Sequence, residues 1–451
     1  MNTDKPSDDV TILVGAEALI TGDLKEINIG PGKRGWMEGW KTIDTSLTWT
    51  VQIPQADVFE ICVLAFSPKG SRIELSVNGQ TLTAKLDTYA NRTTLGLAKL
   101  PAGDVILRIR SASDEPDIVF YSLEVIRPDV KKAMQERAIS LRADTQWLIE
   151  AKYGLMFHWT SQTVPATGEP KSYAKAVEDF DVPRFVDMVE QCGAGAIIFT
   201  TSHGEWYFPG PILLIDKMIP GRTTSRDLIM ELADALNARG IKLILYQNPG
   251  HDDPEWWRLT GYEKGDKTAY FDQWCKVVEA IGKHYGEKVA GWWFDDSFFC
   301  HYPYQAPWEQ MLKSSRAGHP GRLVGVNSFT FPKATDFQDY FCGEIFVNEV
   351  AEVGERFLPE GGTGRFVGGP QNGLQAVITA LFEMHSGWVH VAKDTPIAMP
   401  VMNAQELVNL INHCAARKNV PFFNLEIYQD ATISPASFEV FQQAARALKR
   451  H

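Results

Sequence analysis

The chain has 451 residues, of which 44% are hydrophobic and 22% charged, and its formal net charge at pH 7 is −12. A chain of this length is longer than one ordinary hydrophobic core supports. It predicts two domains, or one large barrel with an added module. A surface this acidic repels a phosphate backbone, so we expect no nucleic-acid partner.

The sequence contains no membrane or targeting signal. No apolar run approaches the roughly 20 residues that a membrane helix needs, so we expect no membrane partner. The first ten residues, MNTDKPSDDV, are polar and acidic and resemble no leader peptide. We therefore expect a cytoplasmic location, with a periplasmic or secreted one as the alternative if a leader was removed.

Cysteine and histidine spacing gives no sign of a metal or redox site. The six cysteines lie far apart without a CxxC pair, which favours buried, reduced thiols. The ten histidines show neither HExxH nor HxH spacing. We expect no metal and no other cofactor.

Residues 1–128 are expected to form an antiparallel β-sandwich, because apolar and polar residues alternate in short segments separated by Gly, Pro, Asn and Asp. The segments are 46–53, 58–66, 72–79, 93–100, 104–112 and 118–128. Asn78-Gly79 directly follows the apolar Val77 and predicts a hairpin turn, because both residues tolerate a positive φ.

The role of this sandwich has two interpretations. It could bind carbohydrate through Trp36, Trp40 or Trp49, because flat indole rings stack on sugars. It could equally be a packing or oligomerisation module, which leaves a homo-oligomer open. We favour the structural role, because the sequence establishes no line of exposed aromatic residues.

Residues 129–150 are rich in Ala, Lys, Arg, Glu and Gln and predict a helical connector. From 151 to 451, short apolar strands alternate with amphipathic helices, so the strands should be parallel. The strands are expected at 154–159, 195–202, 241–248, 289–296, 323–329, 339–345 and 420–428. No GxGxxG or GxxxxGK[ST] motif follows any of them, which favours a (β/α)8-like TIM barrel over a nucleotide-binding sheet.

Four successive strands of this barrel end in polar or reactive residues, and barrel enzymes carry their reacting groups at the C-terminal ends of strands. These endings are His158-Trp159, Ser202-His203, Tyr246-Gln247-Asn248 and Asp295-Asp296. The succession predicts a polar pocket at one end of the barrel.

The fourth strand is the most informative, because side chains on a strand alternate between its faces. Trp293 and Asp295 should face the barrel axis, while Trp292 and Phe294 should pack under helices. A carboxylate above an indole suits a sugar ring, although Asp295 or Asp296 could instead cap a helix. Aromatic residues crowd these strand ends, which favours sugar stacking, with core packing as the alternative. They are Trp159, Trp206, Tyr207, Trp256, Trp257, Trp292, Trp293, Phe298 and Phe299.

Five segments extend this pattern over about residues 130–451: WLIEAKYGLMFHW (147–159), FDVPRFVDMVEQCGAGAIIFTTSHGEWYF (180–208), LILYQ (243–247), GWWFDD (291–296) and a closing unit at 404–435. Together they resemble the α-L-fucosidases of glycoside hydrolase family 29. The resemblance implies an oligosaccharide or glycoside substrate and a retaining double displacement, with Asp295 as the nucleophile that forms a covalent glycosyl-enzyme.

The same resemblance implies the remaining site residues. The substrate-binding residues would be His158, Trp159, His203, Glu205, Trp206, Tyr246 and Trp293. Glu344, at the end of the strand expected at 339–345, is the first choice for the acid/base. Glu205, Asp296 and Glu349 are its rivals.

The sequence departs from the family pattern at four places, one of which is Glu205-Trp206-Tyr207, where an acidic-Gly-aromatic sequence is usual. Gly204 follows His203 where a second His is usual, Asp296 follows the nucleophile where Gly is common, and Asn327 stands in a stretch that often carries Arg. These departures leave open another L-sugar, a related 6-deoxy sugar or an L-galactose-like ring. They also motivate an alternative, a non-catalytic carbohydrate-binding protein on a decayed barrel. A metal-dependent barrel hydrolase or isomerase is a third hypothesis, against which the lack of clustered His argues.

Overall fold

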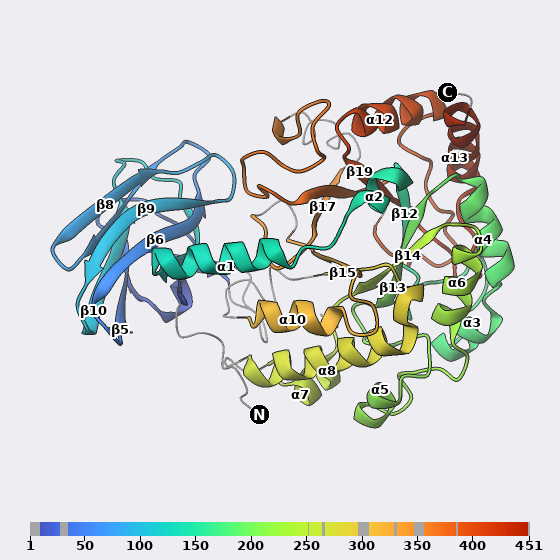
Figure 1. The fold of residues 1–451 in the computed structure, drawn as a ribbon, viewed down its shortest axis with the longest axis horizontal. Coiled ribbons are helices and arrows are strands. Elements are labelled where there is room, and N and C mark those ends of the chain that lie inside the picture. Colours follow the sequence, from blue (N-terminus) through green and yellow to red (C-terminus); the bar gives the residue numbers. More distant parts are fainter. Residues whose placement is uncertain are drawn as a thin grey trace.

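The computed structural model describes residues 10–27, 35–250, 252–263, 267–295, 306–328, 332–346, 356–384 and 387–449. A β-rich unit lies beside a barrel surrounded by helices, and one long helix runs from the first to the second (Figure 1). No helix within these ranges combines the length and the apolar composition that crossing a bilayer requires.

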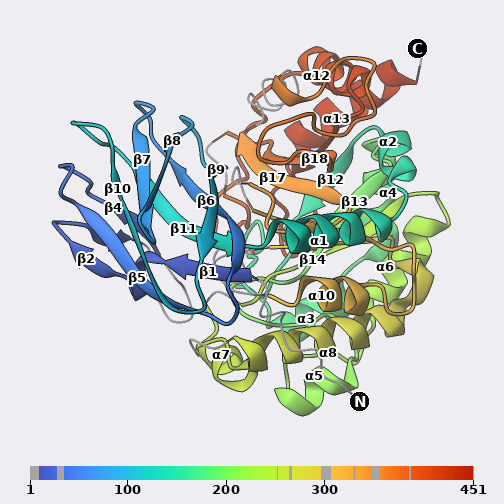
Figure 2. The ribbon, with the colours of Figure 1, turned by 60° about the vertical axis from the view of Figure 1, so that its left-hand side comes forward.

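The N-terminal unit is an antiparallel sandwich, as predicted. Within the described residues, one sheet has the order β3-β4-β11-β6-β9, with β1 also paired to β11, and the other has the order β2-β5-β10-β7-β8. The first sheet contains β1 (Val10–Val14), β3 (Lys25–Ile27), β4 (Trp36–Glu38), β6 (Asp57–Phe66), β9 (Asn91–Leu100) and β11 (Val119–Ile126). The second contains β2 (Leu19–Thr21), β5 (Ser46–Ile53), β7 (Arg72–Val77), β8 (Gln80–Lys85) and β10 (Gly103–Ser111). The two sheets pack face to face (Figure 2).

The predicted hairpin turn is confirmed. Asn78 and Gly79 both have positive φ, 45° and 70°, and Val77 pairs with Gln80 across the turn. Trp40 and Trp49 are buried in the sandwich core, so neither offers an exposed ring to a sugar. The third tryptophan named above, Trp36, is half-buried and lies against the ring of Tyr121 at 5.9 Å.

The connector is two helices rather than one, α1 (Pro128–Ser140) and α2 (Gln146–Ala151). The segment between them is fixed to the barrel by the buried Asp339, which pairs with Arg316 at 2.7 Å and accepts the backbone N–H of Ala143 at 2.7 Å. Arg316 also donates to the carbonyl of Leu141. This ion pair holds the chain where it passes from the sandwich into the barrel.

Residues 154–424 form a closed parallel barrel of eight strands in sequence order, which confirms the TIM-barrel prediction. The strands are β12 (Gly154–Phe157), β13 (Ala196–Ser202), β14 (Lys242–Gln247), β15 (Gly291–Phe294), β16 (Leu323–Val326), β17 (Tyr340–Phe346), β18 (Gln375–Leu381) and β19 (Val420–Asn424). Seven of the eight strands lie where they were predicted, and β18 was not predicted.

Helices cover the outside of the barrel (Figure 1). Those described are α3 (Tyr173–Asp179), α4 (Val182–Gln191), α5 (Leu213–Met218), α6 (Leu228–Asn237), α7 (Pro254–Thr260), α8 (Thr268–Tyr285), α10 (Trp308–Ser315), α12 (Ala404–Ala416) and α13 (Pro435–Leu448). Three of these helices begin after a capping aspartate: Asp181, Asp227 and Asp253 each accept a backbone N–H from the first turn of the helix that follows.

Two glycines let large rings fill the barrel interior. A Cβ on Gly154 would lie 2.1 Å from the ring of Phe422, and a Cβ on Gly325 would lie 2.4 Å from the ring of Tyr340. Both contacts are too close for any larger residue. The interior is therefore packed with side chains, and a substrate can enter only beyond the strand ends.

The cysteines agree with the expectation from spacing. The five that the structure describes, Cys62, Cys192, Cys275, Cys342 and Cys414, are all buried free thiols. Cys300 lies outside the described residues.

Candidate active site

The C-terminal ends of neighbouring strands bring Asp295 and Asn327 together. Asp295 directly follows β15, and its N–H donates to the Gln247 carbonyl at 2.9 Å. Asn327 directly follows β16, and its N–H donates to the Phe294 carbonyl at 2.7 Å. These bonds continue the barrel ladder past the strands, so the backbone holds both residues at one end of the barrel.

The Asp295 carboxylate accepts three hydrogen bonds. Its Oδ2 receives the Tyr246 hydroxyl and the Asn248 amide, the latter at 2.9 Å. Its Oδ1 receives the Asn327 amide at 2.8 Å. All three donors are neutral and stabilise negative charge on a carboxylate that is only 8% exposed. Oδ2 thus carries two of these donors and Oδ1 one.

Glu344 lies on the other side of Asn327. It sits on β17, half-buried, and its Oε1 accepts a hydrogen bond from the same Asn327 amide nitrogen at 2.6 Å. One nitrogen therefore contacts Asp295 Oδ1 and Glu344 Oε1 at once. The two oxygens lie at most about 5.4 Å apart, which is the two bond lengths laid end to end.

Tyr246 is held between two other rings. It stacks on Trp293 with a centroid distance of 5.0 Å and on His203 with 6.0 Å. Trp293 has no exposed surface and lies in the barrel interior, whereas Trp292 packs outward among the helices. The predicted alternation of faces along β15 is therefore confirmed.

His158 presents a hydrogen-bond acceptor to the pocket. Asn424 donates its Nδ2 to the Trp388 carbonyl at 3.2 Å, so its Oδ1, 2.7 Å from His158 Nδ1, must accept. Nδ1 thus carries the proton and Nε2 keeps a lone pair. Burial lowers the pKa of His158 to about 4, although Asn424 and Asp295 oppose this shift. The ring is therefore neutral near pH 7.

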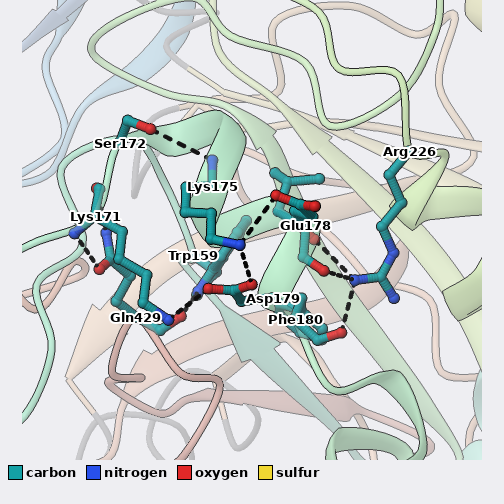
Figure 3. A network of polar contacts seen from close by, with 10 residues as sticks. Trp159, Lys171, Ser172, Lys175, Glu178, Asp179, Phe180, Arg226 and Gln429 are labelled. Atoms are coloured by element: carbon teal, nitrogen blue, oxygen red, sulfur yellow. Dashed lines mark hydrogen bonds and ion pairs between the residues drawn. The ribbon is translucent and has the colours of Figure 1, made fainter.

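Trp159 and Trp206 are not brought to this group. Trp159 lies outside the barrel wall, where its Nε1 donates to the Gln429 carbonyl at 3.1 Å beside α3 (Figure 3). Trp206 is buried and stacks on Trp256 at 4.0 Å. Glu205 is exposed on the loop after β13 and accepts the Ser161 hydroxyl at 2.9 Å.

The structure thus gathers six of the nine residues expected at the site: Asp295, Glu344, Tyr246, His158, His203 and Trp293. Asp296, Glu349, Phe298 and Phe299 lie outside the described residues. The group also contains Asn248, which was predicted only as part of a polar strand ending, and Asn327, Asn424 and Trp388, which were not among the expected site residues. The three asparagines could have been found by position alone, because each lies at the end of a barrel strand or directly after it.

No group of three or more His, Cys, Asp or Glu side chains suited to a metal occurs in the part of the chain that the structure describes. The chemistry available to the described group comes from two carboxyls, amide and hydroxyl donors, and a neutral imidazole.

Glu383 and Glu426, which follow β18 and β19, are both buried carboxyls. Glu383 accepts the Ser437 hydroxyl at 2.8 Å and the Glu426 N–H at 3.2 Å. Burial, with a smaller contribution from the Glu426 charge, raises the pKa of Glu383 from 4.5 to about 8. Glu383 is therefore protonated in the folded protein at neutral pH.

This shift predicts a pH dependence of stability. Between pH 4.5 and 8 the folded state holds a proton on Glu383 that the unfolded state releases, so the free energy of unfolding falls as pH rises. Glu383→Gln, which is neutral at every pH, should remove this slope. The free energy of unfolding of the variant, relative to that of the wild type, should therefore rise by about 1 kcal/mol for each pH unit between pH 4.5 and 8. Urea unfolding at pH 5, 6, 7 and 8 measures it, and parallel curves for the two proteins would contradict the assignment.

Comparisons with known proteins support the resemblance seen in the sequence. A family model described as alpha-L-fucosidase matches residues 171–352. A tissue alpha-L-fucosidase from Bos taurus is 29% identical over 161 residues, covering 28% of this chain and 33% of the relative. One from Macaca fascicularis is 27% identical over 160 residues, with the same coverage. The matched region thus spans about a third of the length of these relatives. The predicted resemblance to α-L-fucosidases is confirmed.

Among solved structures, an endo-fucoidan hydrolase from glycoside hydrolase family 107 has a TM-score of 0.50 and 13% identity, covering 70% of this chain and 54% of that chain. At this identity the likeness concerns the fold alone.

Proposed function

We propose that the protein is a retaining exo-glycosidase of the α-L-fucosidase type, which hydrolyses a terminal α-L-fucoside or a related L-sugar. One observation carries the proposal: a single Asn327 amide nitrogen contacts Asp295 and Glu344 together. Retaining glycosidases hold their two carboxyl groups about 5–5.5 Å apart, whereas inverting enzymes keep them about 6.5–9.5 Å apart to admit a water. The upper limit of about 5.4 Å between the two bridged oxygens supports the retaining geometry.

In the first step, Asp295 attacks the anomeric carbon. The attacking oxygen is Oδ1, because Oδ2 already accepts both Tyr246 and Asn248 and because Oδ1 is the oxygen on the Glu344 side. The bond from the anomeric carbon to the aglycone oxygen breaks, and Glu344 donates its proton to that oxygen. The products are a neutral aglycone alcohol, a glycosyl ester on Asp295 and an ionised Glu344.

In the second step, the Glu344 carboxylate takes a proton from a water, whose oxygen attacks the anomeric carbon from the side that the aglycone left. The ester bond breaks and Asp295 leaves as a carboxylate. Tyr246, Asn248 and Asn327 stabilise the charge that returns to it. Two inversions at one carbon leave the sugar with its original configuration.

Neutral polar groups beside the nucleophile suit sugar hydroxyls. His158 offers Nε2 as an acceptor for a hydroxyl proton, and His203 lies next to it with a ring-centroid distance of 5.4 Å. Trp293 is fully buried, so it acts by supporting Tyr246. It stacks on the ring of Tyr246, whose hydroxyl donates to the nucleophile.

The proposal is tested first with the purified protein on a panel of 4-nitrophenyl α-L-glycosides that includes fucoside, galactoside and rhamnoside. We expect release of nitrophenol from the fucoside or its close relatives, with an α-configured sugar as the first product by NMR. Binding of L-fucose without turnover of any member would support the decayed-barrel hypothesis instead.

The acid/base role of Glu344 makes a separate prediction. Glu344→Ala should lower kcat by about 10²–10⁴-fold on substrates with poor leaving groups, which need the proton most. On 4-nitrophenyl substrates, sodium azide should restore turnover, because azide attacks the glycosyl-enzyme without a base. The product should be a glycosyl azide with the substrate's own configuration.

Glu205→Ala, Asp296→Ala and Glu349→Ala are the matched variants for this test, since these carboxyls are the rivals of Glu344. We expect no azide effect in any of them. Azide rescue in one of them and not in Glu344→Ala would transfer the role to that residue.

A further inference from the structure

Trp388 is a half-buried indole beside the pocket that the mechanism above does not use. It follows β18 in the chain, and its ring lies 5.4 Å from the ring of His158 at an angle of 54°. Its backbone carbonyl accepts Asn424 Nδ2, and the other atom of that same amide faces His158 Nδ1. Asn424 therefore fixes the loop backbone at Trp388 and the tautomer of His158 together.

One buried carboxylate holds the loop on both sides of Trp388. Glu426 Oε1 accepts the Gly387 N–H at 2.9 Å, and Glu426 Oε2 faces His390 Nδ1 at 2.7 Å. Gly387 and His390 bracket Trp388 in the chain. The two oxygens of the Glu426 side chain thus hold the residues on either side of Trp388 in place.

The Glu426 contacts are built into the protein rather than formed at its surface. Glu426 is 7% exposed and His390 is 3% exposed. The His390 carbonyl accepts the Val164 N–H at 3.1 Å, and its ring meets Tyr428 edge to face at 4.9 Å. A buried carboxylate is costly unless donors satisfy it, and charge-assisted bonds of this kind are among the stronger ones in proteins.

We propose that Glu426 is a positioning residue that holds Trp388 in place as a wall of the sugar pocket. This inference rests on the proposed glycosidase function and extends it to the shape of the substrate. An indole face next to the acceptor His158 fits a pyranoside that presents a C–H-rich edge beside a hydroxyl group. Holding the ring before the sugar arrives reduces the entropy lost on binding.

A double-mutant cycle on the full-length protein tests the proposal, using Trp388→Ala, Glu426→Ala and the double variant. The readouts are kcat and KM for 4-nitrophenyl α-L-fucoside and inhibition by L-fucose. Trp388→Ala should raise KM and the inhibition constant roughly tenfold through the loss of stacking. Glu426→Ala should raise them by a similar factor and leave kcat within about threefold, because Asp295 and Glu344 keep their contacts.

The decisive expectation is that the double variant is no worse than Trp388→Ala alone, because Glu426 acts through the indole. Glu426→Gln keeps one acceptor for Gly387 and should fall between wild type and Glu426→Ala. It also serves if Glu426→Ala does not fold. Asp234→Asn, a substitution of an exposed aspartate on α6, is the control and should leave KM unchanged.

The two levels of the proposal fail differently. A wild-type protein that hydrolyses no member of the α-L-glycoside panel would refute the proposed function before any variant is made. An active wild type, with Glu426→Ala at wild-type KM or with effects of the two substitutions that multiply, would refute the positioning role alone.

Discussion

Asp295→Asn should lower kcat on an aryl α-L-fucoside by on the order of 10⁴-fold or more, because the amide cannot form the covalent glycosyl-enzyme. The substitution keeps the size of the side chain, and Tyr246, Asn248 and Asn327 remain to occupy their places around it. The variant should therefore fold and still bind L-fucose. Steady-state kinetics and calorimetry with L-fucose separate these two outcomes.

Azide gives this experiment a second readout. With Asp295→Ala, azide should occupy the space left by the carboxylate and attack the anomeric carbon directly. One inversion then gives a glycosyl azide of the opposite configuration, in contrast to the retained azide expected from Glu344→Ala. Asp234→Asn, a substitution of an exposed aspartate on α6, is the matched control and should leave kcat unchanged. Asp295→Asn with more than a tenth of wild-type kcat would exclude Asp295 as the nucleophile.

Arg322→Met should destabilise the folded protein by roughly 4 kcal/mol or more, because it removes five hydrogen bonds at once, three of them buried. Arg322 has no exposed surface, and all five of its N–H groups donate to backbone carbonyls. The acceptors are the carbonyls of Gly282, Gly286, Val289, Ser315 and Ala317. These carbonyls lie in or just after the last turns of α8 and α10 and just before β15, so one guanidinium joins three parts of the chain.

Burial lowers the pKa of Arg322 to about 10, so the group stays charged at neutral pH and makes charge-assisted bonds. Arg322→Lys should recover part of the loss, since an ammonium has three donors and not the planar set of five. Urea unfolding at pH 7 measures both variants. The catalytic rate at low temperature should change little, because Arg322 directly precedes β16 and lies at the opposite end of that strand from Asn327.

Arg137→Met is the control for this effect. Arg137 forms an ion pair with Glu309 at 2.6 Å, but both side chains are about half exposed, so water replaces the lost contact. We expect its unfolding curve to overlay that of the wild type. If Arg322→Met lost no more unfolding free energy than Arg137→Met, the carbonyls around Arg322 would have found other hydrogen-bond partners.

Much of the fold follows from local patterns in the sequence. Alternation along 46–53 or 104–112 predicts the sandwich strands, and Asn78-Gly79 predicts a hairpin that the structure contains. The strand β18 was missed although QAVITAL is apolar and β-branched. It follows a glycine-rich stretch and pairs with β17 without a preceding amphipathic segment that the sequence analysis could recognise, so its periodicity alone did not distinguish it from a loop.

The same pattern argument explains one success and one omission at the site. Alternation along β15 places Trp293 and Asp295 inward and Trp292 outward, as the structure shows. Applied to His158-Trp159, alternation would have sent the indole outward, where it in fact packs, instead of keeping both residues at the pocket.

Seven of the eight barrel strands, the barrel and the inward direction of Asp295 could be predicted, because each depends on residues close together in the chain. The position of Asn327 between Asp295 and Glu344, and the contacts of Glu426 on both sides of Trp388, arise only when the chain has folded. The residues next to an amide or a carboxylate in the sequence do not indicate its hydrogen-bond partner. Its partner is chosen when closure of the barrel brings the ends of separate strands within hydrogen-bonding distance.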